Sequence, residues 1–176
     1  MLAIYRTKSA LQLKFIPPKM TKFPSQTSDI GDSRLVLKDP GAVFFEATVG
    51  ENKVFDWSKK VNFAISDVDF VAMFEGFRLY ELTNAIEKNA KGKNVVTGLI
   101  DIFLTHDPNA GTDKAGTGMI KTFKISNASF PGTYYLTISY MENKKVINSV
   151  SIPMTEGDLL RIKYLLMYCY PKTLGI

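Results

Sequence analysis

The chain has 176 residues, of which 45% are hydrophobic and 22% are charged, a balance typical of an ordered soluble domain rather than a disordered tail. Lysine and arginine exceed aspartate and glutamate by 22 to 17, so the net charge of +5 suits a polyanionic partner without requiring one. One cysteine and one histidine exclude a disulfide framework within the chain and a tetrahedral zinc site.

Alternation of apolar and polar residues from Tyr5 onward predicts one strand with a single face toward the core. The apolar positions of this strand are Tyr5, Leu11, Leu13 and Phe15. Three cations lie on its opposite face, namely Arg6, Lys8 and Lys14. Pro17 and Pro18 end the strand, because proline cannot donate to a sheet ladder.

A polar stretch over residues 21–32 is predicted to be a loop, because it contains Pro24 and Gly31. Three strands are then expected, at Arg34–Lys38, Ala42–Val49 and Val54–Ile65. In the last of these, alternation places five apolar residues on one face, namely Phe55, Trp57, Val61, Phe63 and Ile65.

Ser66 and Asp69 form a capping-box pattern, which predicts that a helix starts near Asp67. Apolar residues follow at helical spacing, at Phe70, Met73, Phe74 and Phe77. The same period continues through Leu79, Leu82 and Ile86. The helix is therefore expected to run toward Ala90, where a segment rich in lysine and glycine ends it.

The second half of the chain repeats this plan. Strands are expected at Gly98–Thr105, Met119–Ser126, Thr133–Met141 and Val146–Ile152. A capping-box pattern at Thr155 starts a helix whose apolar stripe is Leu159, Ile162, Leu166 and Cys169, and Pro171 closes it. We expect one α+β domain over residues 1–176, with two antiparallel four-stranded β-sheets and two helices in the order ββββα, repeated.

Four segments resemble the Whirly family of single-strand-binding proteins and occur in the same order. Residues 55–60, Phe-Asp-Trp-Ser-Lys-Lys, are similar to that family's Tyr-Asp-Trp-Ser-Arg-Lys segment. Residues 5–11 resemble its Lys-Gly-Lys-Ala-Ala-Leu motif, and residues 105–108 resemble its Phe-His-Asp-Pro. Residues 170–175 resemble its closing Pro-x-Leu-Leu-Gly, so the match spans about residues 4–175.

The resemblance implies a homotetramer whose protomers pack through their helices and hold single strands along radiating strand edges. Arg6 and Thr7 replace the Lys-Gly of the first motif, and Ile176 stands where a tryptophan often ends the domain. Residues 79–98 form an inserted helix or loop segment that the plant family lacks. The kinetoplastid mitochondrial RNA-binding proteins share the fold, so RNA annealing is the alternative within the class.

Sequence-independent binding of a single strand needs cations for the phosphates and exposed rings for the bases. Arg6, Lys8 and Lys14 are predicted phosphate contacts, and an edge strand that lysine protects from aggregation is the alternative. Alternation alone directs Trp57 into the core, whereas the resemblance favours a cleft between protomers. Lys59 and Lys60 are predicted phosphate contacts, with a plain solvated edge as the alternative.

Four further candidates lie on strands whose outward face the pattern leaves open, namely Lys121, Lys124, Tyr134 and Tyr140. His106 precedes Asp107, but the chain has no nucleophile pattern that would complete a catalytic triad. Residues 91–94 also lack the phosphate-loop pattern of nucleotide hydrolases. We therefore predict no enzyme activity, no metal, no cofactor and a structural role for His106 at a strand end.

The sequence thus predicts sequence-independent binding of single-stranded DNA, with strand protection or annealing, in replication, recombination or repair. The alternatives are an RNA-binding or annealing factor, and a structural scaffold that kept the fold but lost the ligand. No membrane partner is expected, because no segment approaches the roughly 18 consecutive apolar residues of a membrane span. The strand pattern of the domain begins close to Met1, which favours the cytoplasm of a bacterium or phage-infected host, with an organelle or the nucleus as alternatives.

Overall fold

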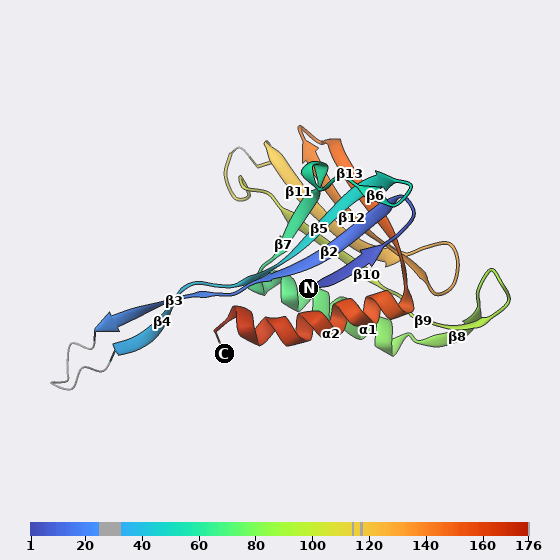
Figure 1. Cartoon of the computed structure of the whole chain (residues 1–176), viewed down its shortest axis with the longest axis horizontal. Coiled ribbons are helices and arrows are strands. Elements are labelled where there is room, and N and C mark those ends of the chain that lie inside the picture. Colours follow the sequence, from blue (N-terminus) through green and yellow to red (C-terminus); the bar gives the residue numbers. More distant parts are fainter. Residues whose placement is uncertain (25–32, 114, 117, 176) are drawn as a thin grey trace.

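The computed structural model describes residues 1–24, 33–113, 115–116 and 118–175. Within these residues the chain forms two main antiparallel sheets, two short hairpins and two long helices (Figure 1). This arrangement confirms the predicted α+β class. The first sheet has five strands instead of the four that were expected, because two turns divide the predicted strands.

The first sheet consists of β1 (Leu2–Tyr5), β2 (Ser9–Ile16), β5 (Ala42–Glu51), β6 (Val54–Phe55) and β7 (Val61–Ile65). The single strand predicted from Tyr5 is wrong, because the chain turns at residues 6–8 and β2 returns beside β1 with Tyr5 opposite Ala10. The strand predicted over 54–65 is also wrong. It is divided by a short 3₁₀ turn, η1 (Trp57–Lys59).

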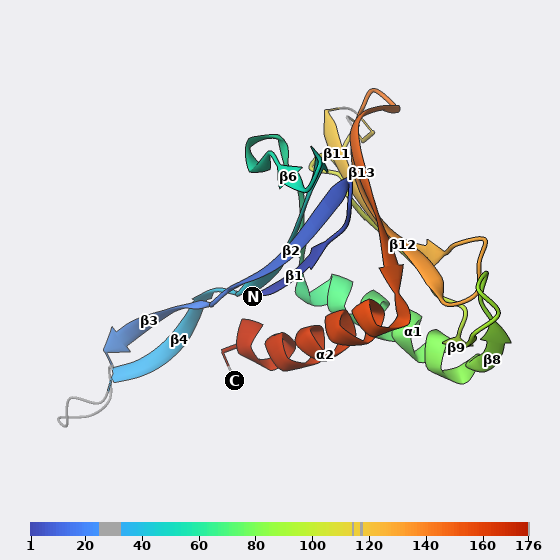
Figure 2. The same cartoon turned by 45° about the vertical axis from the view of Figure 1, so that its right-hand side comes forward.

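Between β2 and β5 the chain forms a hairpin of β3 (Lys19–Pro24) and β4 (Ser33–Asp39). This hairpin projects away from the body of the molecule in both views (Figures 1 and 2). The strand predicted at Arg34–Lys38 is confirmed within β4. Of the predicted loop, residues 21–24 belong to β3, and residues 25–32 lie outside the described residues.

The second sheet has the four strands expected for it. They are β10 (Asp101–His106), β11 (Met119–Asn127), β12 (Thr133–Glu142) and β13 (Lys145–Thr155). Each strand pairs antiparallel with the next, in the order β10-β11-β12-β13. The expected strand starting at Gly98 begins three residues later, because Asn127 accepts the N–H of Ile100 with its side chain and holds that segment outside the ladder.

The two helices are α1 (Asp67–Leu82) and α2 (Glu156–Thr173), and both predicted capping boxes are present. The predicted extension of α1 toward Ala90 is wrong. Thr83 ends the helix, donating its hydroxyl to the Leu79 carbonyl at 2.8 Å and accepting the N–H of Leu99 at 2.7 Å. The chain continues as the hairpin β8 (Ala85–Lys88) and β9 (Asn94–Thr97). No helix in the described part is long and apolar enough to cross a membrane.

The two sheets form the sides of a wedge, and the helices close its open base (Figure 2). Phe45 and Phe63 from the first sheet meet Phe123 from the second, with ring centres 4.9 and 5.4 Å from Phe123. All three rings are fully buried. Burying a side chain of this size stabilises the fold by about 1.5 to 3 kcal/mol, so the core between the sheets holds the wedge together.

Each helix start is tied to the sheet of the other half of the chain. Asp69, in the capping box of α1, accepts a hydrogen bond at 2.8 Å from Nε2 of His106 on β10. Asp158, in the capping box of α2, pairs with Arg6 from the β1–β2 turn. Carboxylates in a first helical turn are favoured by the helix dipole, and here each one also joins the two halves.

Candidate functional site

The β5–β6 hairpin lies beside the β1–β2 turn, at the end of the first sheet where these strands turn. Asn52 and Lys53 have positive φ angles of 51° and 65°, as a two-residue hairpin turn requires. The buried hydroxyl of Thr48 donates to the carbonyl of Asp56 at 2.7 Å. The N–H of Gly50 donates to the carbonyl of Lys8 at 3.0 Å, so the two turns are held together.

Two aromatic rings and three lysines gather at these joined turns. The rings of Tyr5 and Phe55 lie 5.6 Å apart, and Tyr5 is 58% exposed. Lys8 and Lys59 line a groove of about 720 Å³ beside Phe55. Lys53 lines an adjoining hollow of about 480 Å³ with both rings. We call these five residues the ring–lysine platform.

The lysines of the platform remain open to a ligand. Lys8 and Lys53 are exposed and form no ion pair with any described residue. Lys59 is 78% exposed at its side chain and lies 3.3 Å from the carboxylate of Asp56. Hydrogen bonds from Ser58, with a further contribution from Lys59, hold the pKa of Asp56 below its usual value. An exposed pair of this kind is weak, so a phosphate can compete for Lys59.

The predicted phosphate contacts Lys14 and Lys60 are occupied elsewhere. Both ammonium groups lie 2.6 Å from the carboxylate of Glu46, which also accepts from the Gln12 amide at 2.8 Å. Burial would raise the pKa of Glu46, but the bonds and charges of the two lysines outweigh it and lower the pKa. Lys14 and Lys60 therefore neutralise a buried acid rather than extend the platform.

Arg6 is also placed differently from the prediction. Its Nε donates to the carbonyl of Pro153 at 2.7 Å, and its guanidinium pairs with Asp158. These contacts fasten the β1–β2 turn to the end of β13 and to the start of α2. Arg6 thus positions Tyr5 and Lys8 on either side of it, and its own charge is used within the protein.

The candidates on the second sheet are scattered. Tyr134 is fully buried against Tyr80, with ring centres 5.9 Å apart, so its ring is not available to stack on a base. Tyr140 and Lys121 are half-buried, and both bond to Asn62 of β7 where the two sheets meet. Lys124 is exposed on the opposite face of β11, away from these contacts.

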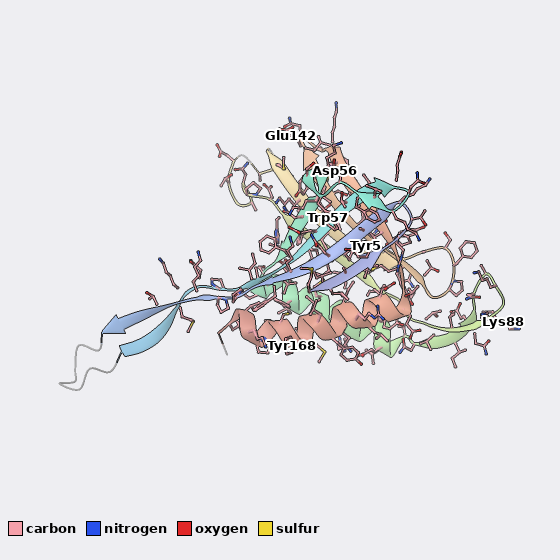
Figure 3. All side chains as sticks on the ribbon, in the orientation of Figure 1. Tyr5, Asp56, Trp57, Lys88, Glu142 and Tyr168 are labelled. Carbon is pink, nitrogen blue, oxygen red and sulfur yellow. The ribbon has the colours of Figure 1, made fainter. Side chains whose placement is uncertain are left out.

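Trp57 is half-buried and belongs to η1, so it does not share a strand face with Val61 and Phe63 as alternation had predicted. This 3₁₀ turn interrupts the alternation of the strand, because the Asp56 carboxylate accepts a hydrogen bond from the backbone N–H of Ser58 at 3.0 Å. Trp57 lies close to Asp56, over the first sheet (Figure 3). It stays a candidate for ligand contact outside the two hollows of the platform.

His106 ends β10, as predicted, and its imidazole serves the fold. The ring stacks on Phe63 at 4.1 Å while Nε2 bonds to Asp69. Among the described residues, no three His, Cys, Asp or Glu side chains gather as a metal site requires. The arrangement at the platform can hold a polyanion with planar groups, and it places rings and ammonium groups where such a ligand would meet them.

Sequence reasoning missed three platform residues, Tyr5, Lys53 and Phe55. It assigned both rings to the core on alternation, and Lys53 received no role. The available signal was Asn52-Lys53 between two alternating runs, since an asparagine in such a two-residue link favours a tight hairpin turn with its tip exposed.

The comparisons with known proteins agree with this fold. The crystal structure of WHY1 from Arabidopsis thaliana matches with a TM-score of 0.68 and 18% identity, over 99% of this chain and 84% of that one. WHY3 from the same plant matches with a TM-score of 0.69 and 17% identity, over 99% and 88%. The plant transcriptional regulator PBF-2 gives 0.69 and 18%, over 99% and 81%. None of the curated proteins compared with the chain matches it.

Two antiparallel sheets closed by two helices, with rings and lysines presented at the turns of the first sheet, define an α+β binding domain. The family model described as Whirly transcription factor matches residues 4–93, which is more than half of the chain. The chain therefore belongs to the Whirly family, as the resemblance of its motifs indicated.

Proposed function

We propose that this chain binds single-stranded DNA without regard to base sequence. The observation that carries the proposal is the ring–lysine platform, in which Tyr5 and Phe55 form a pair of rings flanked by Lys8, Lys53 and Lys59. Every base has a face that stacks on an aromatic ring, and every nucleotide has a phosphate that a lysine attracts. Such a surface binds a single strand without distinguishing its base sequence.

Binding of this kind protects or anneals strands, and we place the protein in replication, recombination or repair on that ground. The proposed role is that of a binding protein rather than an enzyme. The one histidine bonds to a helix cap, and the exposed groups of the platform are lysines and rings. These groups hold a polynucleotide through charge and stacking, and no bond needs to change.

We also propose that the protein is a homotetramer that packs through its helices. Large apolar side chains remain exposed on both helices of the single chain, namely Val68, Val71, Leu79, Leu82, Tyr164, Met167 and Tyr168. Exposed apolar side chains on two helices that pack against each other favour an interface. Tyr168 lies on α2, on the side of the molecule away from the sheets (Figure 3).

Two alternatives make different predictions. An RNA-binding or annealing factor would gain affinity from contacts to the 2′-hydroxyl group, whereas the platform offers mainly rings and ammonium groups. A scaffold that lost its ligand would bind neither nucleic acid. Retained binding is favoured by the exposed ring of Tyr5 and by Lys8 and Lys53, which form no ion pair with any residue that the structure describes.

A competition experiment separates these readings. Labelled poly-dT bound to the protein is challenged with unlabelled poly-dT, poly-rU and duplex DNA at equal nucleotide concentration. We expect poly-dT to compete best and duplex DNA to compete weakly, because paired bases cannot stack on the rings. Stronger competition by poly-rU would identify the RNA-binding alternative, and absence of any binding would leave the scaffold.

A further inference from the structure

The β8–β9 hairpin carries a second concentration of positive charge, outside the platform. Its tip presents Lys88, Lys91 and Lys93 as exposed side chains, and residues 88–93 contain no acid. None of the three forms an ion pair with any described residue, whereas Lys14 and Lys60 are both paired with Glu46. The charge of the tip is therefore available to an external anion.

The turn that carries these lysines has a defined shape. The side-chain oxygen of Asn89 accepts from the N–H groups of Lys91 and Lys93, at 2.9 and 3.1 Å. The N–H of Asn89 donates in turn to the carbonyl of Lys93 at 2.9 Å. A bonded turn loses less conformational entropy on binding than an open loop does, which favours recognition of a polyanion.

The base of the hairpin is fastened to the second sheet. The amide of Asn127 donates to the carbonyl of Gly98 at 2.8 Å, and Val95 packs on Gly132 in the β11–β12 loop. A groove of about 240 Å³ lies between the hairpin base and this loop. Phe130, which lines the groove, is 60% exposed. The hairpin thus has lysines at its tip and an exposed ring beside its base, where Glu87 also lines the groove.

This surface is separate from the platform. The β8–β9 hairpin and β6 lie at different ends of the molecule in both views (Figures 1 and 2). Lys88 is correspondingly distant from Tyr5 and Trp57 (Figure 3). We therefore expect that a strand of a few nucleotides bound at the platform does not reach the hairpin of the same protomer.

We propose that the β8–β9 hairpin and Phe130 form a second contact for the same single strand, with phosphates on the lysines and a base on the ring. This inference rests on the proposed function. It adds that a long strand is held at two places on one protomer, so affinity depends on strand length through residues that a short strand does not touch.

The test compares two oligonucleotides, one of about 8 thymidines, within the site sizes of roughly 4 to 16 nucleotides known for single-strand-binding domains, and one of about 40, well above them. Lys91→Gln with Lys93→Gln is the test variant. Lys144→Gln with Lys145→Gln is its matched control, because this pair removes the same charge from another exposed hairpin tip. Thermal melting checks that both variants are folded.

We expect the test variant to bind the long strand about tenfold more weakly near 0.1 M salt, with a slope of log K against log salt that is shallower by about 1.4. Its affinity for the short strand should equal that of the parent. The control pair should leave both affinities unchanged. Equal losses from the two pairs would reduce the effect to net charge and overturn the inference, as would an unchanged affinity for the long strand.

Phe130→Ala supplies an independent measurement. We expect it to weaken binding of the long strand at least fivefold at a salt concentration where the lysine contribution is screened, and to leave the salt slope intact. Unchanged binding would remove the ring from the contact. If anionic vesicles of phosphatidylserine bound the parent and lost only the Lys91 and Lys93 variant, the partner would be a lipid surface and the inference would be wrong.

The outcomes also separate this inference from the proposed function. A parent protein that binds neither oligonucleotide contradicts both. A parent that binds the short strand, and binds the long one equally well with or without the hairpin lysines, retains the proposed function and loses only the second contact.

Discussion

The ring of Phe55 lies against Gly50, its partner across the β5–β6 ladder. A Cβ atom at position 50 would come within 2.6 Å of Cδ1 of Phe55 and 2.2 Å of the Val54 carbonyl oxygen. Any side chain there must therefore push β6 away from β5. The absence of a side chain at Gly50 sets where the Phe55 ring stands, and with it the pairing of Phe55 with Tyr5.

Gly50→Ala should accordingly displace the ring pair and weaken binding of single-stranded DNA by about 1 kcal/mol or more, with a stability loss of about 1 to 3 kcal/mol from overpacking. Fluorescence titration with oligo-dT and thermal melting measure the two effects. Gly157→Ala is the control, because a Cβ there meets only Thr155 Oγ1 at 3.8 Å. A folded Gly50→Ala protein with full affinity would show that the ring position is unimportant.

Tyr5→Ala tests stacking most directly, because the exposed ring of Tyr5 contributes little to the core. We expect affinity for oligo-dT to fall by about 1 to 3 kcal/mol while the salt slope stays the same. Tyr135→Ala removes a comparably exposed ring, 43% accessible, from the outer face of the second sheet and should leave binding unchanged. Equal losses from the two variants would mean that the platform is not the stacking site.

Alternation predicted the core of this protein well and its turns poorly. Leu11, Leu13 and Phe63 are buried, as their positions indicated, because a half-buried strand has only one apolar face. The same alternation does not reveal the turn at residues 6–8, because Tyr5 before the turn and Leu11 after it are both apolar residues at odd-numbered positions. The fold was therefore accessible at the level of class, while the order of strands at one edge was not.

The candidate site shows the same limit in another form. The sequence shows where each lysine lies along the chain, but it does not show which acid pairs with that lysine. This partner decides whether the charge of the lysine is available to a ligand. Lys14 and Lys60 converge on Glu46 only after three strands assemble, and Arg6 meets Asp158 from the far end of the chain. Of Arg6, Lys8 and Lys14, only Lys8 pairs with no acid among the described residues, and this difference depends on long-range contacts.

The three lysines of the platform make the contribution of charge to binding measurable. Each of Lys8→Gln, Lys53→Gln and Lys59→Gln should make the slope of log K against log salt shallower by about 0.7, the value for one phosphate contact on a single strand. Lys124→Gln, on the second sheet, is the control and should leave the slope unchanged. Titrations at several salt concentrations measure this. A change in slope for Lys124 alone would move the interface to the second sheet.

Met167→Glu tests the proposed helix interface, because Met167 lies 51% exposed on α2 among other apolar side chains. A buried carboxylate opposes association, so we expect light scattering to give a mass near the single-chain 19.7 kDa in place of a tetramer. Val146→Glu introduces the same group at the β12–β13 turn, where Val146 is 59% exposed, and should leave the oligomer intact. A parent protein that is monomeric at micromolar concentration would contradict the interface.

Glu46→Gln tests how the buried acid supports the sheet beneath the platform. The folded pKa of Glu46 lies below the ordinary value of about 4.3. The charge of Glu46 therefore stabilises the fold at pH values above about 4.3, and this stabilisation is lost as the pH falls through the folded pKa. We expect the variant to be less stable than the parent by about 1 to 3 kcal/mol at pH 7, because Lys14 and Lys60 lose a charged acceptor.

The difference between parent and variant should then shrink as the pH falls from about 5 toward 3, because protonation removes the same charge from the parent. Urea unfolding at a series of pH values measures it. Glu142→Gln changes an exposed carboxylate on β12 and serves as the control, with little effect expected at any of these pH values. A constant difference between parent and Glu46→Gln across this range would show that shape and hydrogen bonding, rather than the charge of Glu46, hold the two lysines in place.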